Sequence, residues 1–274
     1  MLHKTIPLHQ PDSLSKACAI TYLLDHSEQS YLKKRPVIVI CPGGGYEHLS
    51  PRESEPIALQ FNAMGYHAIL VNYSLAPITY PTQLYEVASV VKMIYEHGEE
   101  WHIDTSKIIL TGFSAGGHLA GDFCMNWSKP FLSEALQTES SLLKPAGMIL
   151  SYPVVSTGPN AHQGSFLNLL GNRYEELKSD VSLEHLVNKD TPPAFIWHTF
   201  TDQSVPVENS LLLVDALRKC NISTEFHIFP QGRHGLALAN ELTAWEDGSG
   251  ILPECSVWLS LAQTWLQNLF QENF

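Results

Sequence analysis

The sequence predicts an α/β protein, with a mostly parallel central sheet, helices on both of its faces and a small cap insertion. Short continuous runs of apolar and β-branched residues alternate with longer runs in which apolar residues recur at helical spacing. Continuous apolar runs are typical of strands buried on both faces, and strand–helix alternation makes successive strands parallel. Because α/β folds of 274 residues commonly form one unit, we expect a single domain over residues 1–274.

The expected strands divide into a parallel set and a short edge. The parallel strands are the apolar runs at residues 36–41, 66–73, 107–111, 147–152, 194–199 and 224–229. Two shorter alternating stretches, Leu2–Pro7 and Cys18–Asp25, are expected to pair as an antiparallel edge before the main sheet.

The expected helices lie between these strands, over residues 51–65, 80–101, 114–127, 206–220 and 255–270. Gly65 is a helix-ending signal and Pro206 a helix-starting one. Residues 153–193 are long, polar and contain only short helical pieces. Since long loops inside compact domains are usually functional, we interpret this segment as a cap or pocket wall.

Composition excludes several classes of partner. The chain has 16 basic and 28 acidic residues, a net charge of −12, which argues against nucleic acid and anionic membranes. No apolar run approaches the roughly 18 residues of a membrane span. The five cysteines show neither metal-binding nor disulfide spacing, and the first residues lack an apolar signal core, so a cytoplasmic location is expected. The oligomeric state is left open, a homo-oligomer included.

The segment Gly-Phe-Ser-Ala-Gly at residues 112–116 stands between a predicted strand and a predicted helix. That is the context of the G-x-S-x-G nucleophile elbow, in which small residues flank a sharp turn. The serine then projects above the sheet, over a helix N-terminus that favours negative charge. So short a pattern also arises by chance. The assignment therefore depends on its place between a strand and a helix and on the partner residues described next. Ser114 is the predicted nucleophile.

A serine needs a base, normally a histidine held by a carboxylate. Among 13 histidines, His234 follows the last predicted strand and stands between two glycines. Asp202 follows the preceding strand. Active sites of parallel sheets lie beyond the carboxyl ends of the strands, and the chain order serine, aspartate, histidine is typical of one hydrolase fold. We therefore predict Ser114, Asp202 and His234 as the catalytic residues.

Other candidate residues have less favourable positions. They lie within predicted helices or strands, on the surface, or away from the carboxyl edge of the sheet: His48, His118, His198, Asp104, Asp122 and Glu208. His118, on the helix after the elbow, is expected to pack beneath the loop, and His198 is expected to be a hydrogen-bonded core histidine.

Three consecutive glycines at residues 43–45 follow the first buried strand. Glycines free the backbone to turn N–H groups toward a ligand, although a tight turn without function is the alternative interpretation. An oxyanion hole needs such N–H groups where negative charge develops. We predict that Gly44, Gly45 and Ala115 supply them.

Substrate contacts are predicted from position alone. Tyr46 and Phe113 are expected to narrow the space beside Ser114. Ser165, in the most polar patch of the 153–193 segment, is expected to meet a hydroxyl-rich leaving group; a plain surface loop is the alternative.

On these residues the chain resembles the α/β-hydrolase superfamily, in the branch of small esterases with an HGGG-type loop. It is more closely similar to bacterial esterases grouped with acetyl-xylan and sugar-ester hydrolases. The resemblance covers about residues 36–240, from the glycine loop to His234-Gly235. One departure is that Pro42 replaces the histidine of HGGG, so support for the loop must come from elsewhere.

The resemblance implies a serine carboxylic-ester hydrolase acting through an acyl-enzyme on short-chain, acetyl esters of sugars or xylo-oligosaccharides. It implies a small-molecule ester as partner and no metal or organic cofactor. An arylformamidase or amidase, or an exopeptidase, is the enzymatic alternative. A ligand receptor on a hydrolase scaffold is the alternative of another class, and such proteins commonly lose a member of the triad.

Overall fold

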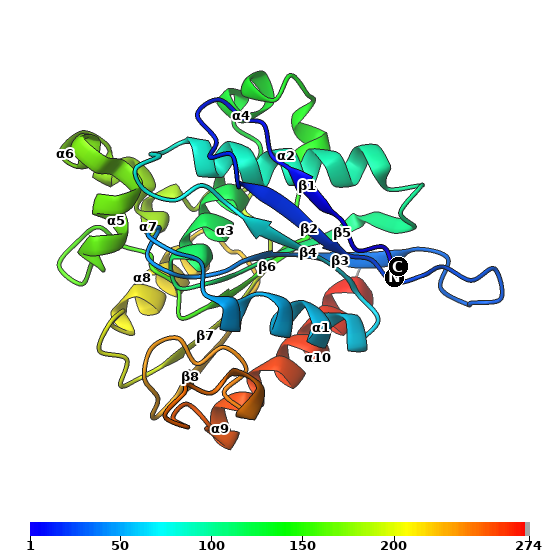
Figure 1. Ribbon diagram of the computed structural model, residues 1–274. Coiled ribbons are helices and arrows are strands. Elements are labelled where there is room, and N and C mark those ends of the chain that lie inside the picture. Colours follow the sequence, from blue (N-terminus) through cyan, green and yellow to red (C-terminus); the bar gives the residue numbers. More distant parts are fainter. Residues whose placement is uncertain (272–274) are drawn as a thin grey trace.

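A computed structural model describes residues 1–271 and contains one eight-stranded sheet over that range (Figure 1). The strands are β1 (Thr5–Pro7), β2 (Cys18–Tyr22), β3 (Arg35–Cys41), β4 (His67–Asn72), β5 (Ile103–Phe113), β6 (Gly147–Ser151), β7 (Ala194–Thr199) and β8 (Thr224–Phe229). Their order across the sheet is β1-β2-β4-β3-β5-β6-β7-β8.

All pairs from β4 to β8 are parallel, whereas β1 and β2 join the sheet by antiparallel pairing. Both features were predicted from the apolar runs and are confirmed. The central strand β5 is longer than predicted, since it begins at Ile103 rather than residue 107. Cys41 at the end of β3 pairs with Gly112 near the end of β5, so the segments that follow these two strands are neighbours.

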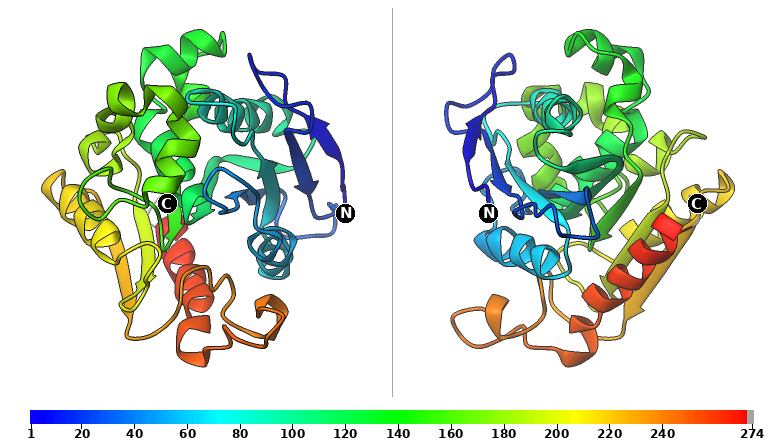
Figure 2. Two further views of the ribbon diagram at one scale, coloured as in Figure 1. Left: turned by 60° about the vertical axis from the view of Figure 1, so that its left-hand side comes forward. Right: turned by 90° about the vertical axis from the view of Figure 1, so that its right-hand side faces the viewer.

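The sheet lies between two layers of helices (Figures 1 and 2). The longer helices are α1 (Glu55–Ala63), α2 (Thr82–His97), α3 (Ala115–Asn126), α8 (Glu208–Lys219) and α10 (Trp258–Gln271). Apolar side chains of α2, α3 and α8 pack with one core cluster, and those of α1 and α10 with another. Alternate residues of β3 divide between the two: Val37 and Val39 face the first cluster, Ile38 and Ile40 the second. Burial on both faces explains the absence of polar alternation in the strands.

The remaining helical elements are short. They are η1 (Pro51–Glu53), α4 (Pro130–Ala135), η2 (Ser140–Leu143), α5 (Gln163–Leu170), η3 (Gly171–Arg173), α6 (Tyr174–Leu177), η4 (Lys178–Val181), α7 (Leu183–Leu186), η5 (Glu241–Thr243) and α9 (Pro253–Ser256). The helix predicted over residues 51–65 is therefore a 3-10 turn followed by α1. Ser54 separates them with φ −106° and ψ −109°, a backbone conformation that a continuous helix cannot contain.

The 153–193 segment folds as a series of short helices, α5 to α7, over one core cluster. Phe166, Leu169 and Leu170 of α5 are buried in that cluster, while Leu167 is 46% exposed. Their burial directs the apolar side of α5 inward and leaves polar residues of the segment to face outward. Within residues 1–271, no helix combines the length and apolar character needed to cross a membrane.

We expect Trp258→Ala to destabilise the fold strongly. The Trp258 indole is fully buried, stacks on Trp197 with ring centroids 5.3 Å apart, and donates its Nε1–H to the Ala237 carbonyl at 2.9 Å. Its removal leaves a cavity and an unpaired carbonyl, at a cost of about 3–5 kcal/mol in the free energy of unfolding. Urea denaturation followed by circular dichroism measures this loss.

The matched control is Val257→Ala, because Val257 is the adjacent residue and is 43% exposed. A loss for Trp258→Ala no larger than that for Val257→Ala would contradict this account of the packing between α10 and the sheet.

Candidate active site

Ser114 occupies a strained turn between β5 and α3. Its φ of 54° and ψ of −119° are uncommon for a residue with a Cβ, and they place the side chain beyond the end of the strand. The chain passes very close to itself on both sides of the turn. A Cβ at Gly112 would lie 2.1 Å from the Gly116 carbonyl oxygen, and a Cβ at Gly116 would lie 2.1 Å from the Cys41 carbonyl oxygen. Both glycines are therefore required by close backbone contact.

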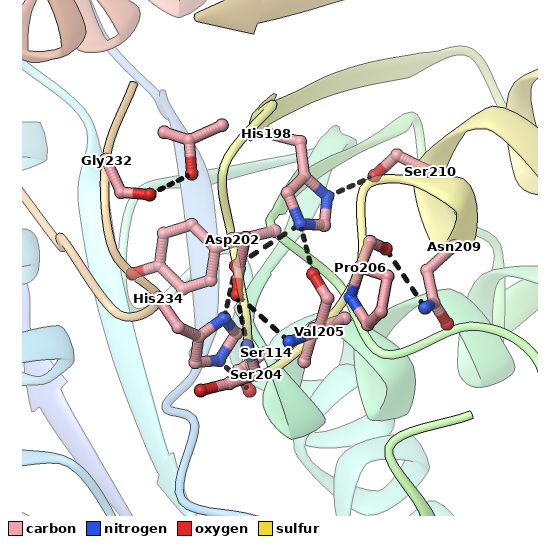
Figure 3. A network of polar contacts seen from close by, with 12 residues as sticks. Ser114, His198, Asp202, Ser204, Val205, Pro206, Asn209, Ser210, Gly232 and His234 are labelled. Atoms are coloured by element: carbon pink, nitrogen blue, oxygen red, sulfur yellow. Dashed lines mark hydrogen bonds and ion pairs between the residues drawn. The ribbon is translucent and has the colours of Figure 1, made fainter. Parts of the chain in front are cut away.

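The three predicted catalytic residues meet in one hydrogen-bonded chain (Figure 3). The Ser114 hydroxyl donates to His234 Nε2 at 2.7 Å, and His234 Nδ1–H donates to Asp202 Oδ2 at 2.6 Å. The other carboxylate oxygen of Asp202 accepts the backbone N–H groups of Ser204 and Val205 at 2.9 and 3.0 Å. The three side chains come from the carboxyl ends of β5, β7 and β8, which are separate in sequence and share one edge of the sheet.

The Asp202 carboxylate is buried yet ionised. Burial alone would raise its pKa, but hydrogen bonds from His198, His234 and the Val205 N–H outweigh it and hold the pKa well below its usual range. An ionised carboxylate at this distance keeps the proton of the neutral His234 ring on Nδ1, which leaves Nε2 free to accept from Ser114.

His198 is the core histidine that was predicted, but it also contacts Asp202, which the sequence analysis did not anticipate. It is fully buried, with Nδ1 2.8 Å from Ser210 Oγ. Its Nε2 lies 2.9 Å from the Val205 carbonyl oxygen and 3.3 Å from Asp202 Oδ2. Since both of these atoms are acceptors, Nε2 carries a proton shared between them. The only sequence signal was the four-residue spacing between His198 and Asp202.

The glycine loop at residues 42–46 borders a cavity through Gly44 and Gly45, and hydrogen bonds hold its carbonyl groups. Each carbonyl in it accepts a protein hydrogen bond: Pro42 from Tyr73 Oη (2.6 Å), Gly43 from Ser50 N (2.9 Å), Gly44 from Glu47 N and His48 N (3.0 and 3.1 Å), Gly45 from Asn168 Nδ2 (2.9 Å) and Tyr46 from Ala76 N (2.9 Å). Within residues 1–271, the N–H groups of Gly44, Gly45 and Ala115 have no acceptor. Unpaired N–H groups at a loop and a helix N-terminus can bind an anionic oxygen.

The cavity beside Ser114 and His234 has a volume of about 920 Å³, and most of the residues that line it have polar or charged side chains. Long polar side chains line it, among them Arg52, His162, Asn168, Gln203, Gln231 and Arg233. Its large apolar lining residues, within the described range, are Trp245 and Leu252. The guanidinium carbons of Arg52 and Arg233 lie 3.8 and 4.0 Å from the Trp245 ring centroid. The sequence analysis missed these residues, because only the fold brings the 245–252 loop to the cavity.

Two predicted substrate contacts require correction, because their side chains are buried away from the cavity. Phe113 is fully buried and packs against Tyr152 and Trp258, on the α10 face of the sheet. Successive strand residues point to opposite faces, and the turn after Phe113 carries only Ser114 toward the cavity. Tyr46 is also fully buried, with its hydroxyl 2.8 Å from His118 Nδ1. It supports the glycine loop from beneath instead of narrowing the cavity.

Ser165 requires a similar correction. Its side chain is buried, and its hydroxyl lies 2.8 Å from His162 Nδ1. His162, three residues earlier, lines the cavity, as does Asn168. The polar patch of α5 was therefore placed correctly at the site, but a different residue of it faces the cavity.

The other candidate residues lie outside the hydrogen-bonded chain of Ser114, His234 and Asp202. His118 lies beneath the glycine loop, as expected, with Nε2 2.7 Å from the Val181 carbonyl oxygen. Asp122 is paired with Asn126 inside α3. His48 is exposed, as expected, and also lines the cavity.

Solved structures of two hydrolases have the same fold as this chain. The acetyl ester-xyloside bifunctional hydrolase of Caldicellulosiruptor lactoaceticus superposes with a TM-score of 0.84 at 34% identity, over 97% of this chain and 96% of that one. The carboxylesterase Cest-2923 of Lactobacillus plantarum WCFS1 also gives 0.84, at 31% identity over 98% of each chain.

Two curated relatives are similar in sequence. The endo-1,4-beta-xylanase B of Butyrivibrio fibrisolvens is 36% identical over 223 residues, 78% of this chain and 35% of the relative. The acetylxylan esterase of Xylanibacter ruminicola is 31% identical over 206 residues, 72% of this chain and 40% of the relative. The chain thus spans well under half the length of these two relatives.

The fold and these similarities identify the chain as a member of the α/β-hydrolase class. Within that class it belongs to the BD-FAE family, whose profile matches residues 21–217.

We expect His118 to make stability dependent on pH. Burial lowers the pKa of His118 to about 4, although its hydrogen bond to the Val181 carbonyl partly opposes this. An unfolded histidine has a pKa of about 6.5, so the unfolded chain binds more protons as the pH falls from about 6.5 to 4. Stability is therefore lost across that window and is unaffected by His118 above it.

His118→Gln keeps a donor for Val181 and an acceptor for Tyr46 but does not titrate. Between pH 7.5 and 5, the wild-type protein should lose about 2 kcal/mol more unfolding free energy than this variant. Urea denaturation at both pH values measures the difference, with His9→Gln, at an exposed position, as the control. Equal losses in wild type and His118→Gln would show that this histidine does not contribute.

Proposed function

We propose that the protein is a serine carboxylic-ester hydrolase that acts through an acyl-enzyme on short-chain esters, chiefly acetyl esters of sugars or xylo-oligosaccharides. The observation that carries the proposal is the hydrogen-bonded chain from Ser114 through His234 to Asp202, next to unpaired backbone N–H groups. This combination matches what acyl transfer requires: a nucleophile, a base held in one tautomer, and donors for an oxyanion.

In the first half of the reaction, Ser114 Oγ attacks the ester carbonyl carbon while His234 Nε2 takes the hydroxyl proton. The carbonyl oxygen becomes an oxyanion and accepts hydrogen bonds from the N–H groups of Gly44, Gly45 and Ala115. Asp202 stabilises the imidazolium that forms and is not itself protonated. The intermediate collapses, His234 gives its proton to the leaving alcohol, and an acyl ester of Ser114 remains.

In the second half, a water molecule attacks the acyl carbon and gives its proton to His234 Nε2. The same N–H groups accept the second oxyanion. Collapse of this intermediate breaks the bond to Ser114 Oγ, which recovers its proton from His234. The products are the alcohol and the carboxylic acid, and the chain returns to its starting state without a cofactor.

The polar side chains that line the cavity support a hydroxyl-rich alcohol as leaving group. Side chains such as Asn168, Gln203 and Gln231 can exchange hydrogen bonds with sugar hydroxyls, whereas few apolar side chains are present to bind an alkyl chain. The acetylxylan esterase named among the relatives is consistent with this choice.

We also infer a cytoplasmic location. All five cysteines are free thiols, four of them buried, as is usual in a reducing compartment.

We expect Ser114→Ala to abolish ester hydrolysis while leaving the fold intact. With no nucleophile, the acyl-enzyme cannot form, so kcat for nitrophenyl acetate should fall at least about a thousandfold. A fluorophosphonate should label the wild type on Ser114 and leave the variant unlabelled. Ser106→Ala, at an exposed position near the opposite end of β5, is the matched control. A variant that kept about a tenth of the activity would place the nucleophile elsewhere.

We further expect short acyl chains and sugar alcohols to be preferred. Each buried CH₂ would add about 0.8 kcal/mol only where it packs against an apolar side chain, and the large apolar side chains among the described lining residues are Trp245 and Leu252. In a panel of nitrophenyl esters, kcat/KM should therefore fall from acetate to butyrate to octanoate. The same panel, extended to acetylated xylo-oligosaccharides, should release acetate from the sugar esters.

An octanoate ester turned over as fast as the acetate would contradict the short-acyl specificity. Formyl amides cleaved in preference to every ester would favour an arylformamidase or amidase, and turnover of esters without any sugar ester would remove the carbohydrate part of the proposal.

A further inference from the structure

Glu53 is a buried carboxylate next to the catalytic serine, and the reaction described above does not use it. It belongs to the short η1 turn and is 2% exposed. One oxygen, Oε2, accepts the Gly43 N–H at 2.9 Å. The other, Oε1, accepts the Tyr152 hydroxyl at 2.7 Å. A buried carboxylate is costly unless such hydrogen bonds compensate its lost hydration, so both bonds are expected to be firmly held.

Through Tyr152 the network continues to the loop that carries His234. The Tyr152 oxygen accepts the Ala237 N–H at 2.9 Å, and Ala237 lies three residues after the histidine. The Tyr152 ring also packs edge-on against the His234 ring, with centroids 5.0 Å apart. Glu53 thus connects the glycine loop with the histidine loop through a single intermediary side chain.

The carboxylate packs closely against the glycine loop, at one border of the cavity. A Cβ at Gly43 would lie 2.6 Å from Glu53 Oε2 and 3.0 Å from Ser114 Cβ. A Cβ at Gly235 would lie 3.8 Å from Glu53 Oε1. The adjacent Arg52 ties the same histidine loop, since its Nη1 donates to the Gly235 carbonyl at 2.9 Å. Glu53 therefore occupies the space between nucleophile, glycine loop and histidine loop.

Glu53 supplies support for the glycine loop, in which Pro42 replaces the histidine of HGGG. Proline has no N–H, so Gly43 carries the first donor of the glycine loop. Because a carboxylate can only accept hydrogen bonds, Glu53 holds that first donor inward. The next two donors, on Gly44 and Gly45, are then left toward the cavity. The hydrogen bond from Gly43 to Glu53 thereby sets the direction of the oxyanion donors.

We propose that Glu53 is a positioning residue of this site, an inference that rests on the proposed function. Through its hydrogen bonds to Gly43 and Tyr152, Glu53 holds the oxyanion donors and His234 in the correct position relative to Ser114. It touches no reacting atom and transfers no proton. Its effect is geometric, and a displacement of about 1 Å in such groups can cost about a hundredfold in rate.

The first test is Glu53→Gln. A glutamine offers one acceptor oxygen, so it cannot accept from both Gly43 and Tyr152, and its NH₂ group meets one of these donors. We expect kcat for nitrophenyl acetate to fall by about 10- to 100-fold, with KM changed less than about threefold, because the oxyanion donors act in the transition state. The matched control is Glu55→Gln, the same change at an exposed position two residues away, which should retain the wild-type kcat.

The second test asks whether Glu53 and Tyr152 act as one unit. Tyr152→Phe removes the bridging hydroxyl, with Tyr66→Phe, at the amino-terminal end of β4, as its control. If the network positions the site, the double variant should lose no more activity than the more severe single variant. Additive losses in kcat would overturn the idea of a shared network. Should Glu53→Gln fail to fold, a fall in kcat without a matching change in KM for Tyr152→Phe supports the proposal, and an unchanged kcat overturns it.

The third test does not depend on catalysis. Amide hydrogen exchange, followed by mass spectrometry, should be at least about fivefold faster in Glu53→Gln than in wild type for peptides covering residues 43–46 and 235–239. Glu55→Gln should leave both peptides unchanged. If the wild-type protein hydrolyses no ester, the proposed function fails and the exchange rates alone decide the positioning role. Unchanged exchange in both loops would overturn it.

Discussion

The site depends on one backbone constraint, the tight turn that carries Ser114 from β5 into α3. Glycines on both sides permit the chain to approach itself, and the neighbouring strands hold the turn from outside. The Ser114 N–H donates to the Ser151 carbonyl at 3.0 Å, and the Ser114 carbonyl accepts the Val154 N–H at 3.0 Å. The strained conformation is thus stabilised by the last residue of β6 and by the segment that follows it. Every other group of the site is useful only in relation to this fixed side chain.

Buried carboxylates form the second layer of the site. Asp202 is held by donors from the chain after β7 and by two histidines, and Glu53 by Gly43 and Tyr152. In both cases the hydrogen bonds replace the hydration that the carboxylate loses on burial. In both cases the carboxylate also restricts the orientation of a neighbouring group. Groups that are oriented before the substrate arrives need no reorganisation during the reaction, which is the main advantage of a folded catalyst over water.

On the proposed function, chemistry and selectivity come from different parts of the chain. The catalytic geometry is built at the ends of sheet strands, where the backbone is rigid. Much of the cavity wall comes from α5 and from the loop with Trp245 and Leu252, which lie outside the sheet. Loops of this kind can change without disturbing the strand ends.

The sequence by itself determined the alternating strands and helices, the antiparallel edge and the chain order of Ser114, Asp202 and His234. These are local signals: an apolar run marks a buried strand, and a polar residue directly after it lies at the carboxyl edge. Only the tertiary structure decided that Phe113 and Tyr46 turn into the core, and that Glu53 supports the glycine loop in the absence of an HGGG histidine. Such contacts join residues from separate elements, and their direction depends on how the strands, turns and loops pack, which no local pattern records.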